Sequence, residues 1–130
     1  MSALDVKTHP TIEHDLCGAP RELAEGSARV SLSTTAKMAV DERGLVHGGF
    51  VFGAADHAAM LAVNDPNVVL GAAEARFLAP VTAGEEVVAE AKVIDQEGKK
   101  RVISASARVG EREVFAATFT AFVLAQHVLD

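Results

Sequence analysis

The sequence predicts an α+β fold in which an antiparallel β-sheet wraps around one long central helix. A half-buried strand pattern comes first, a nearly uncharged apolar segment follows it, and four further strand-like segments complete the pattern. The chain has 130 residues, of which 49% are hydrophobic, so length and composition fit one domain with a substantial core. We therefore expect a single domain over residues 1–130.

The region before the first predicted strand, residues 1–26, is mixed and polar, and we interpret it as an N-terminal extension. A short helix is expected within residues 10–16, and glycine and proline residues interrupt regular structure after it. Over residues 27–35, apolar and polar residues alternate. This period of two predicts a strand with one buried face, formed by Ala28, Val30 and Leu32.

The central helix is predicted over residues 49–63. Between Gly48 and Asn64 only Asp56 and His57 carry ionisable side chains, and the other residues are small or apolar on every side. That composition is typical of a helix that is buried on most of its surface. A carboxylate inside such a helix costs several kcal/mol unless it is satisfied, so Asp56 needs a functional or structural reason.

Strand-like segments follow the helix at residues 68–78, 86–95, 101–109 and 114–125. Glycine-containing turns separate the last three, which is typical of consecutive antiparallel strands. The segment 114–125 is apolar on both faces, so we expect it inside the sheet rather than at an edge.

Composition excludes several classes of protein. A net charge of −6 argues against nucleic-acid binding, which needs a basic face. The one cysteine, Cys17, excludes an intrachain disulfide and fits a reducing compartment. No signal sequence or membrane-spanning segment is evident, so we expect a cytoplasmic protein without a membrane partner. The five histidines are scattered and no phosphate-binding glycine loop occurs, so neither a metal ion nor another cofactor is expected.

The sequence His47-Gly48-Gly49, with Asp56 nine residues after the histidine, is the most informative motif. With this motif the chain resembles the hotdog-fold acyl-CoA thioesterases, and within them the PaaI-like branch. The similarity continues to Asn64, resumes at residues 77–80 and covers about residues 27–125. The resemblance implies a hotdog domain that forms a homodimer or homotetramer. It also implies sheets joined near residues 68–78, with active sites at the subunit interface.

The resemblance implies hydrolysis of an acyl-CoA thioester to a carboxylic acid and coenzyme A. Asp56 is the predicted nucleophile or general base; the alternative is a buried carboxylate that only bonds a backbone group across the dimer. By resemblance, the Gly48 N–H at the helix N-terminus is the oxyanion donor, while Gly49 permits close approach of the substrate. His47 is a candidate for polarising the carbonyl, although capping the helix is the simpler role.

Two positions depart from the family pattern. Asp41 stands where several relatives carry an asparagine that orients the attacking water, and residues 69–73 lack the hydroxyl group that some relatives supply. Glu74 is the only acid on that strand. These departures favour the alternative of a non-catalytic acyl-CoA-binding hotdog protein with a regulatory role. A third possibility is a hotdog dehydratase or hydratase, but this chain lacks the motif that those enzymes carry near the central helix.

The remaining candidates concern ligand binding. Five cationic side chains are the predicted contacts for the phosphates of coenzyme A: Lys99, Lys100, Arg101, Arg76 and Arg108. The alternative is that they belong to an ordinary solvated hairpin tip. Four apolar residues are predicted to line the acyl pocket: Phe50, Phe52, Met60 and Phe77. The alternative is that they pack in the core. His57 is expected to be a packed or interface residue, and Cys17 has no evident base nearby.

Overall fold

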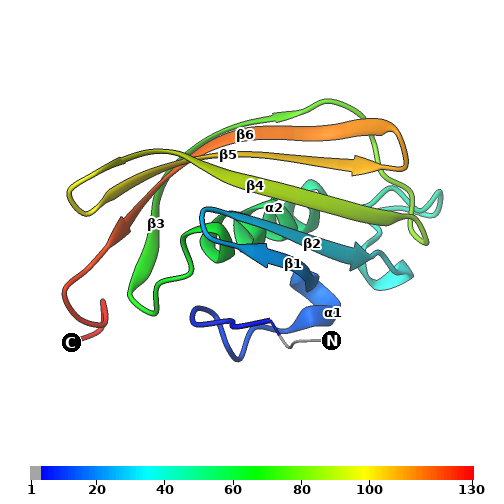
Figure 1. Ribbon diagram of the computed structural model, residues 1–130. Coiled ribbons are helices and arrows are strands. Elements are labelled where there is room, and N and C mark those ends of the chain that lie inside the picture. Colours follow the sequence, from blue (N-terminus) through cyan, green and yellow to red (C-terminus); the bar gives the residue numbers. More distant parts are fainter. Residues whose placement is uncertain (1–3) are drawn as a thin grey trace.

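The structure, a computed structural model, describes residues 4–130. Six strands form one antiparallel sheet in the order β1-β2-β4-β5-β6-β3, and the sheet curves over the central helix α2 (Figure 1). The strands are β1 (Ala19–Ala24), β2 (Ser27–Ser33), β3 (Val68–Phe77), β4 (Glu86–Glu97), β5 (Lys100–Val109) and β6 (Arg112–Val123). The helices are α1 (His14–Cys17), α2 (Gly48–Val63) and the short 3₁₀ helix η1 (Ala36–Met38). The predicted α+β arrangement is confirmed.

Helix α2 packs against the concave face of the sheet, mainly on β2, β4 and β5. Its four central alanines are fully buried, and their small side chains allow the helix backbone to lie close to the strands: Ala54, Ala55, Ala58 and Ala59. The helix ends at Asn64, whose left-handed backbone (φ 52°) is a common way to stop a helix. The predicted boundaries are therefore correct to within one residue.

Strand β6 lies between β5 and β3, so the prediction that this segment is internal is confirmed. Its residues Phe115 and Phe119 point into the core and are fully buried. Strand β3 pairs only with β6 and forms one edge of the sheet. Because most of its side chains are exposed, β3 presents both an unpaired backbone edge and an uncovered surface.

The N-terminal region contains a strand that the sequence analysis missed. Strand β1 pairs with β2 and forms the other edge of the sheet. Its apolar alternation is weak and it contains Pro20, which is tolerated on an edge strand because the missing N–H need not pair. The predicted short helix exists only as the single turn of α1, at the end of the expected segment.

The segment before β1 lies against α2 on the side away from the sheet (Figure 1). The side-chain amide of Asn64 holds this segment at one end. Its oxygen accepts a hydrogen bond from the N–H of Lys7 (2.8 Å), and its nitrogen donates to the carbonyl of Asp5 (2.8 Å). Helix α2 is thus covered by the sheet on one side and by residues 4–18 on another.

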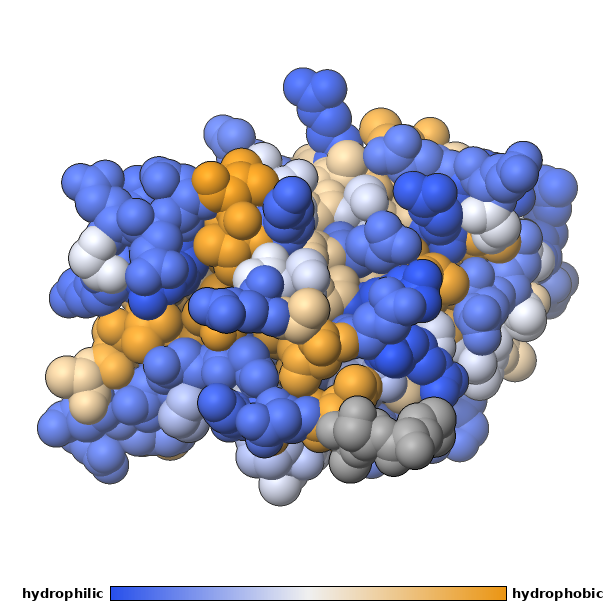
Figure 2. All heavy atoms as spheres, in the orientation of Figure 1, coloured by the Kyte–Doolittle hydropathy of each residue, from blue (hydrophilic) through white to orange (hydrophobic). Residues whose placement is uncertain are grey.

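The surface seen in Figure 2 is largely hydrophilic, with hydrophobic residues gathered mainly in its left and central part, where Figure 1 places β3 and the end of α2. Within residues 4–130, no helix combines the length and hydrophobicity needed to cross a bilayer.

Candidate active site

The HGG motif forms the N-terminal end of α2. His47 is the N-cap residue, and its ring Nδ1 accepts a hydrogen bond from the N–H of Gly49 (2.8 Å). The capping role considered for His47 is therefore present. A Cβ on Gly49 would lie 2.8 Å from this nitrogen, so only glycine fits the cap without a shift. The N–H of Gly48 lies at the first helical position, where backbone N–H groups have no intrahelical acceptor.

Asp56 lies two turns further along α2 and is partly buried. Its Oδ1 is buried and has no hydrogen-bond partner among the described residues. Burial raises the pKa of this carboxyl group from 3.8 to about 6, because desolvation penalises the charged form. A carboxylate with a pKa near neutrality is suited to accept a proton during a reaction. Asp56 therefore has the environment of a general base.

Gly48 and Asp56 are well separated within one chain. Eight residues of α-helix rise about 12 Å along the axis. An oxyanion donor and a base that act on the same carbonyl group each need to be about 3 Å from it. One chain therefore does not place its own Gly48 N–H and Asp56 at a common reacting atom.

The aromatic residues divide between core and surface. Phe52 packs edge-on against Phe115 (centroids 6.1 Å apart) and Phe119 (5.5 Å), and Met60 is fully buried. For these two predicted pocket residues, core packing is the observed role. Phe50 lies edge-on to the ring of His47 at 6.2 Å.

The ring of Phe77 lies beside Gly48. It is 59% exposed, and an ideal Cβ on Gly48 would lie 3.0 Å from its ring. A hollow of about 370 Å³ opens between Phe77 and the start of α2. Sequence reasoning did not identify five of the residues that line it: Leu45, Val46, Val51, Val81 and Val114. The run Phe77-Leu78-Ala79-Pro80 enters the sequence analysis as part of the family resemblance, and only Phe77 is predicted there as a pocket residue.

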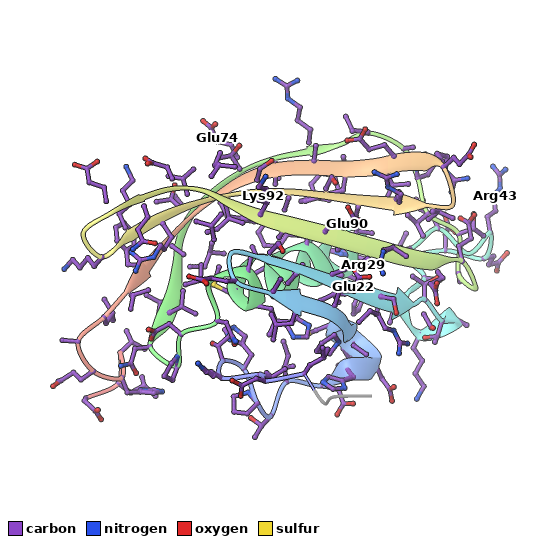
Figure 3. All side chains as sticks on the ribbon, viewed as in Figure 1. Glu22, Arg29, Arg43, Glu74, Glu90 and Lys92 are labelled. Carbon is purple, nitrogen blue, oxygen red and sulfur yellow. The ribbon has the colours of Figure 1, made fainter. Side chains whose placement is uncertain are left out.

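Asp41 has a structural task in the loop before α2. Its Oδ1 accepts hydrogen bonds from the N–H groups of Arg43 (3.0 Å) and Leu45 (3.2 Å). These bonds close the loop, as aspartate side chains often do in turns. The side chain of Glu74 projects from the outer face of the sheet, away from α2 (Figure 3), so it does not approach Asp56 of its own chain.

Among the cationic candidates, those of the β4–β5 hairpin lie away from Gly48 of the same chain. Arg76 alternates with Phe77 on β3 and therefore points to the outer face of the sheet. Lys100 pairs with Phe122 near the start of β3, whereas Phe77 at the end of β3 contacts Gly48. The length of β3 separates these two ends by about 30 Å. The guanidinium of Arg101 donates to the carbonyls of Gly98 (2.7 Å) and Lys100 (3.2 Å), which stabilises the hairpin.

Three histidines that are distant in the sequence lie together between α2 and the N-terminal segment. The ring of His57 stacks on His9 (6.4 Å) and His14 (6.3 Å), and its Nδ1 is 3.1 Å from the carbonyl oxygen of Cys17. His57 is 1% exposed, and burial lowers its pKa. The expected packed role of His57 is thus observed. In the part of the chain that the structure describes, no three metal-ligating side chains are arranged around a common point.

Comparisons with known proteins were made for sequence and structure. The model of the thioesterase superfamily matches residues 43–116. A methylthioribose-1-phosphate isomerase of Aquifex aeolicus is 47% identical over 93% of this chain. Transcription factor FapR of Caldanaerobacter subterraneus is 31% identical over 65% of it. The chain spans 27% and 42% of the lengths of these two relatives, so their names describe longer proteins.

Two solved structures are similar to this domain. An uncharacterised protein from Pyrococcus horikoshii has a TM-score of 0.97 and 48% identity, with all of both chains covered. The PaaI protein from the phenylacetic acid degradation operon of E. coli has a TM-score of 0.73 and 27% identity, covering 79% of this chain and 80% of its own. Since the family model also matches more than half of the chain, this protein belongs to the hotdog-fold thioesterase superfamily.

Proposed function

We propose that this protein is an acyl-CoA thioesterase that hydrolyses a thioester to a carboxylic acid and coenzyme A. The observation that carries the proposal is that one helix carries both Gly48, at its first position, and the partly buried carboxyl group of Asp56, whose Oδ1 has no hydrogen-bond partner among the described residues. The first can hold a developing oxyanion and the second can accept a proton. Membership of the thioesterase superfamily supports the same chemistry.

The separation of about 12 Å between these groups implies that each active site uses two subunits. In this arrangement, Gly48 of one subunit and Asp56 of the other face the same carbonyl group. A homodimer joined edge to edge through β3 would bring the two helices together, because β3 is an unpaired edge and its surface is uncovered. A further pairing into a tetramer is compatible with this site.

The same dimer would explain the distant cations. In an antiparallel β3–β3 pair, the start of β3 in one subunit lies opposite the end of β3 in the other. The hairpin with Lys99, Lys100 and Arg101 of one subunit would then lie at the end where the other subunit has Gly48 and Phe77. We propose these three side chains as contacts for the phosphates of coenzyme A. Arg76 points to the outer face of the sheet, so it is a weaker candidate for a contact with these phosphates.

In the proposed reaction, Asp56 takes a proton from a water molecule, and the water oxygen attacks the thioester carbonyl carbon. The Gly48 N–H of the other subunit stabilises the negative charge on the carbonyl oxygen. The carbon–sulfur bond then breaks, the thiolate takes up a proton and the acid is released. Direct attack by Asp56, followed by hydrolysis of the resulting anhydride, gives the same products.

The first test is thiol release from a panel of acyl-CoA esters by the wild type and by Asp56→Asn. We expect turnover in the wild type and a loss of at least about 100-fold in the variant. Equal turnover in both proteins would exclude Asp56 as the base.

A second test addresses the N–H of Gly48. Proline is tolerated at the first helical position and removes the N–H, and the extended backbone of His47 (φ −60°, ψ 129°) suits a residue before proline. We expect Gly48→Pro to lose about 10²- to 10³-fold in kcat. The matched control Gly48→Ala keeps the N–H and adds the same contact with Phe77, so it reports the steric effect alone. Similar losses in both variants would argue against an oxyanion role.

A shared site predicts complementation. Gly48→Pro and Asp56→Asn subunits, each inactive alone, would form heterodimers in which one of the two sites is intact. Random association after co-expression should restore about a quarter of wild-type activity. No recovery, with heterodimers shown by mass spectrometry, would contradict the two-subunit site.

The second candidate is an acyl-CoA-binding protein with a regulatory role. One oxygen of the Asp41 carboxylate, Oδ1, is engaged in its own loop, which favours a structural role for this side chain over orienting a water molecule. The similarity to a region of transcription factor FapR points the same way. This candidate predicts that acyl-CoA esters raise the melting temperature while no thiol is released.

A further inference from the structure

The edge strand β3 carries two opposite charges that the proposed chemistry does not use. Glu74 projects from the outer face of the sheet (Figure 3), and Arg76, two residues further along the strand, lies on the same face. Both residues are exposed. Within residues 4–130, neither of them makes an ion pair. Two such charges on an unpaired edge are suited to a second strand that carries the same two charges.

The part of β3 that can pair with another strand is short. A β-bulge interrupts its regular geometry between Leu70 and Ala72, where a Cβ on Gly71 would lie 2.5 Å from the ring of Phe122. The strand ends at Phe77. A second strand therefore finds regular backbone only between the bulge and Phe77, so few registers give substantial pairing.

Two-fold symmetry restricts the register further. In an antiparallel pair of identical strands, residue i of one strand opposes residue j of the other, and j opposes i. Both members of a pair face the same side of the sheet, so an outer residue always opposes an outer residue. The two registers with the greatest regular overlap are therefore centred on Glu74 or on Ala75.

The charges distinguish these two registers. A centre at Glu74 places the two Glu74 side chains opposite each other, and like charges in that arrangement are destabilising. A centre at Ala75 places Glu74 of each subunit opposite Arg76 of the other, which gives two ion pairs on the outer face. On the inner face, the same register covers the exposed ring of Phe77 with Ala73 of the other subunit.

We propose that two copies of this chain pair through β3 about a two-fold axis at Ala75, and that ion pairs between Glu74 of each subunit and Arg76 of the other set this register. The inference rests on the dimer of the proposed function and specifies its interface. A register shift of two residues would move one subunit along the other by about 7 Å, more than a hydrogen bond can span. The ion pairs therefore also position Gly48 of one subunit relative to Asp56 of the other.

Charge reversal tests the register. Glu74→Arg alone and Arg76→Glu alone each replace both ion pairs by like-charge contacts. We expect the dissociation constant of the dimer to rise at least about tenfold in each variant. The double variant Glu74→Arg/Arg76→Glu restores both pairs with exchanged signs and should dimerise like the wild type. Sedimentation equilibrium measures the four constants.

Two control variants make the same changes of net charge at exposed positions of β4: Lys92→Glu and Glu90→Arg. They should leave the dissociation constant unchanged. In a register centred on Glu74 or on Arg76, the wild type and all three test variants would carry a like-charge contact at the axis. Equal dissociation constants, or a double variant that does not recover, would therefore overturn the inference.

Cysteine cross-linking tests the position of the axis independently. Residues directly opposite each other in an antiparallel pair have Cα atoms about 4.5–5.5 Å apart, within the span of a disulfide. Ala75→Cys in a Cys17→Ser background should therefore form a covalent dimer on oxidation. Ala73→Cys is the matched control, because its two copies would lie about 14 Å apart. A covalent dimer with Ala73→Cys, or none with Ala75→Cys, would overturn the inference.

Neither measurement depends on turnover, so the two proposals fail separately. A dimer in the expected register that hydrolyses no acyl-CoA ester would reject the proposed function and leave this inference in place. Turnover by a wild type whose dimer is unaffected by the three charge variants would retain the function and overturn this inference.

Discussion

At the scale of single residues, the burial of Asp56 links the stability of the fold to pH. The pKa of its carboxyl group is raised from 3.8 to about 6, so the folded state holds a proton that the unfolded state releases in this window. Stability therefore falls as pH rises from about 4 to about 6, and the loss of at most about 3 kcal/mol then stays constant. The proposed role as a general base would account for a residue that carries this cost in an apolar helix.

Asp56→Asn removes the charge and should raise the melting temperature at about pH 8 by several degrees. The difference from the wild type should disappear at about pH 4, where Asp56 is already protonated. Thermal melts across this pH range provide the measurement, with the exposed Asp95→Asn as the control. A difference that does not change with pH would show that Asp56 titrates normally.

The same pKa predicts the pH profile of catalysis. If Asp56 is the base, it works as the carboxylate, so kcat/KM should increase with pH up to about 6 and then level off. Initial rates of thiol release between about pH 4.5 and pH 8 measure this profile. A rate that shows no inflection near pH 6 would leave the base unassigned.

At the scale of elements, the contact between α2 and the N-terminal segment depends on His57. Its ring is buried between His9 and His14 and bonds the carbonyl of Cys17. Burial lowers its pKa below the ordinary 6.5, so the unfolded state binds more protons in this range. The stability contributed by neutral His57 is therefore complete above about pH 6.5 and is lost as pH falls through the lowered pKa.

Acidification should loosen the N-terminal segment before the sheet. Hydrogen exchange at about pH 5 should be faster than at about pH 7.5 for residues 5–18, after correction for the intrinsic rates, and unchanged for β4 and β5. His57→Gln, which cannot gain a proton, should remove this difference. Uniform acceleration across the domain would show that the effect is global.

The other end of this segment depends on Asn64. Asn64→Ala removes two hydrogen bonds to the segment and places alanine at a left-handed position, so it should cost about 2 kcal/mol. Asn64→Gly keeps the backbone conformation but loses the bonds, so it should cost about 1 kcal/mol. Urea denaturation of both variants separates the two effects. Equal costs would mean that the hydrogen bonds alone matter.

At the scale of the whole molecule, the proposed dimer rests on the edge strand β3. Ala75 pairs with the buried Ala117 and so faces the same side of the sheet as α2. Ala75→Lys would place a charge in the proposed dimer interface, and we expect monomers by analytical ultracentrifugation together with loss of turnover. Ile94→Lys, on an exposed position of β4, is the control. A dimer that survives Ala75→Lys would move the interface elsewhere.

The sequence by itself determined most of the elements and the main groups of the candidate site. Alternation identified β2, strand-like segments between turns identified β3 to β6, the apolar composition identified α2, and the HGG motif with Asp56 indicated the family. These signals are local, because side-chain periodicity follows directly from strand and helix geometry. A carboxylate within an apolar helix can likewise be recognised from the sequence alone.

Only the tertiary structure decided the strand order, the pairing of β1, the hollow beside Gly48 and the stacking of His9 and His14 on His57. It also showed that Gly48, Asp56 and the hairpin cations lie apart within one chain. These features depend on contacts between residues distant in the sequence, and many arrangements of the same elements satisfy the same local periodicity. The distance along α2 is fixed by helix geometry, whereas the proposal of a two-subunit site also needed the tertiary structure, which leaves β3 unpaired at one edge and exposed.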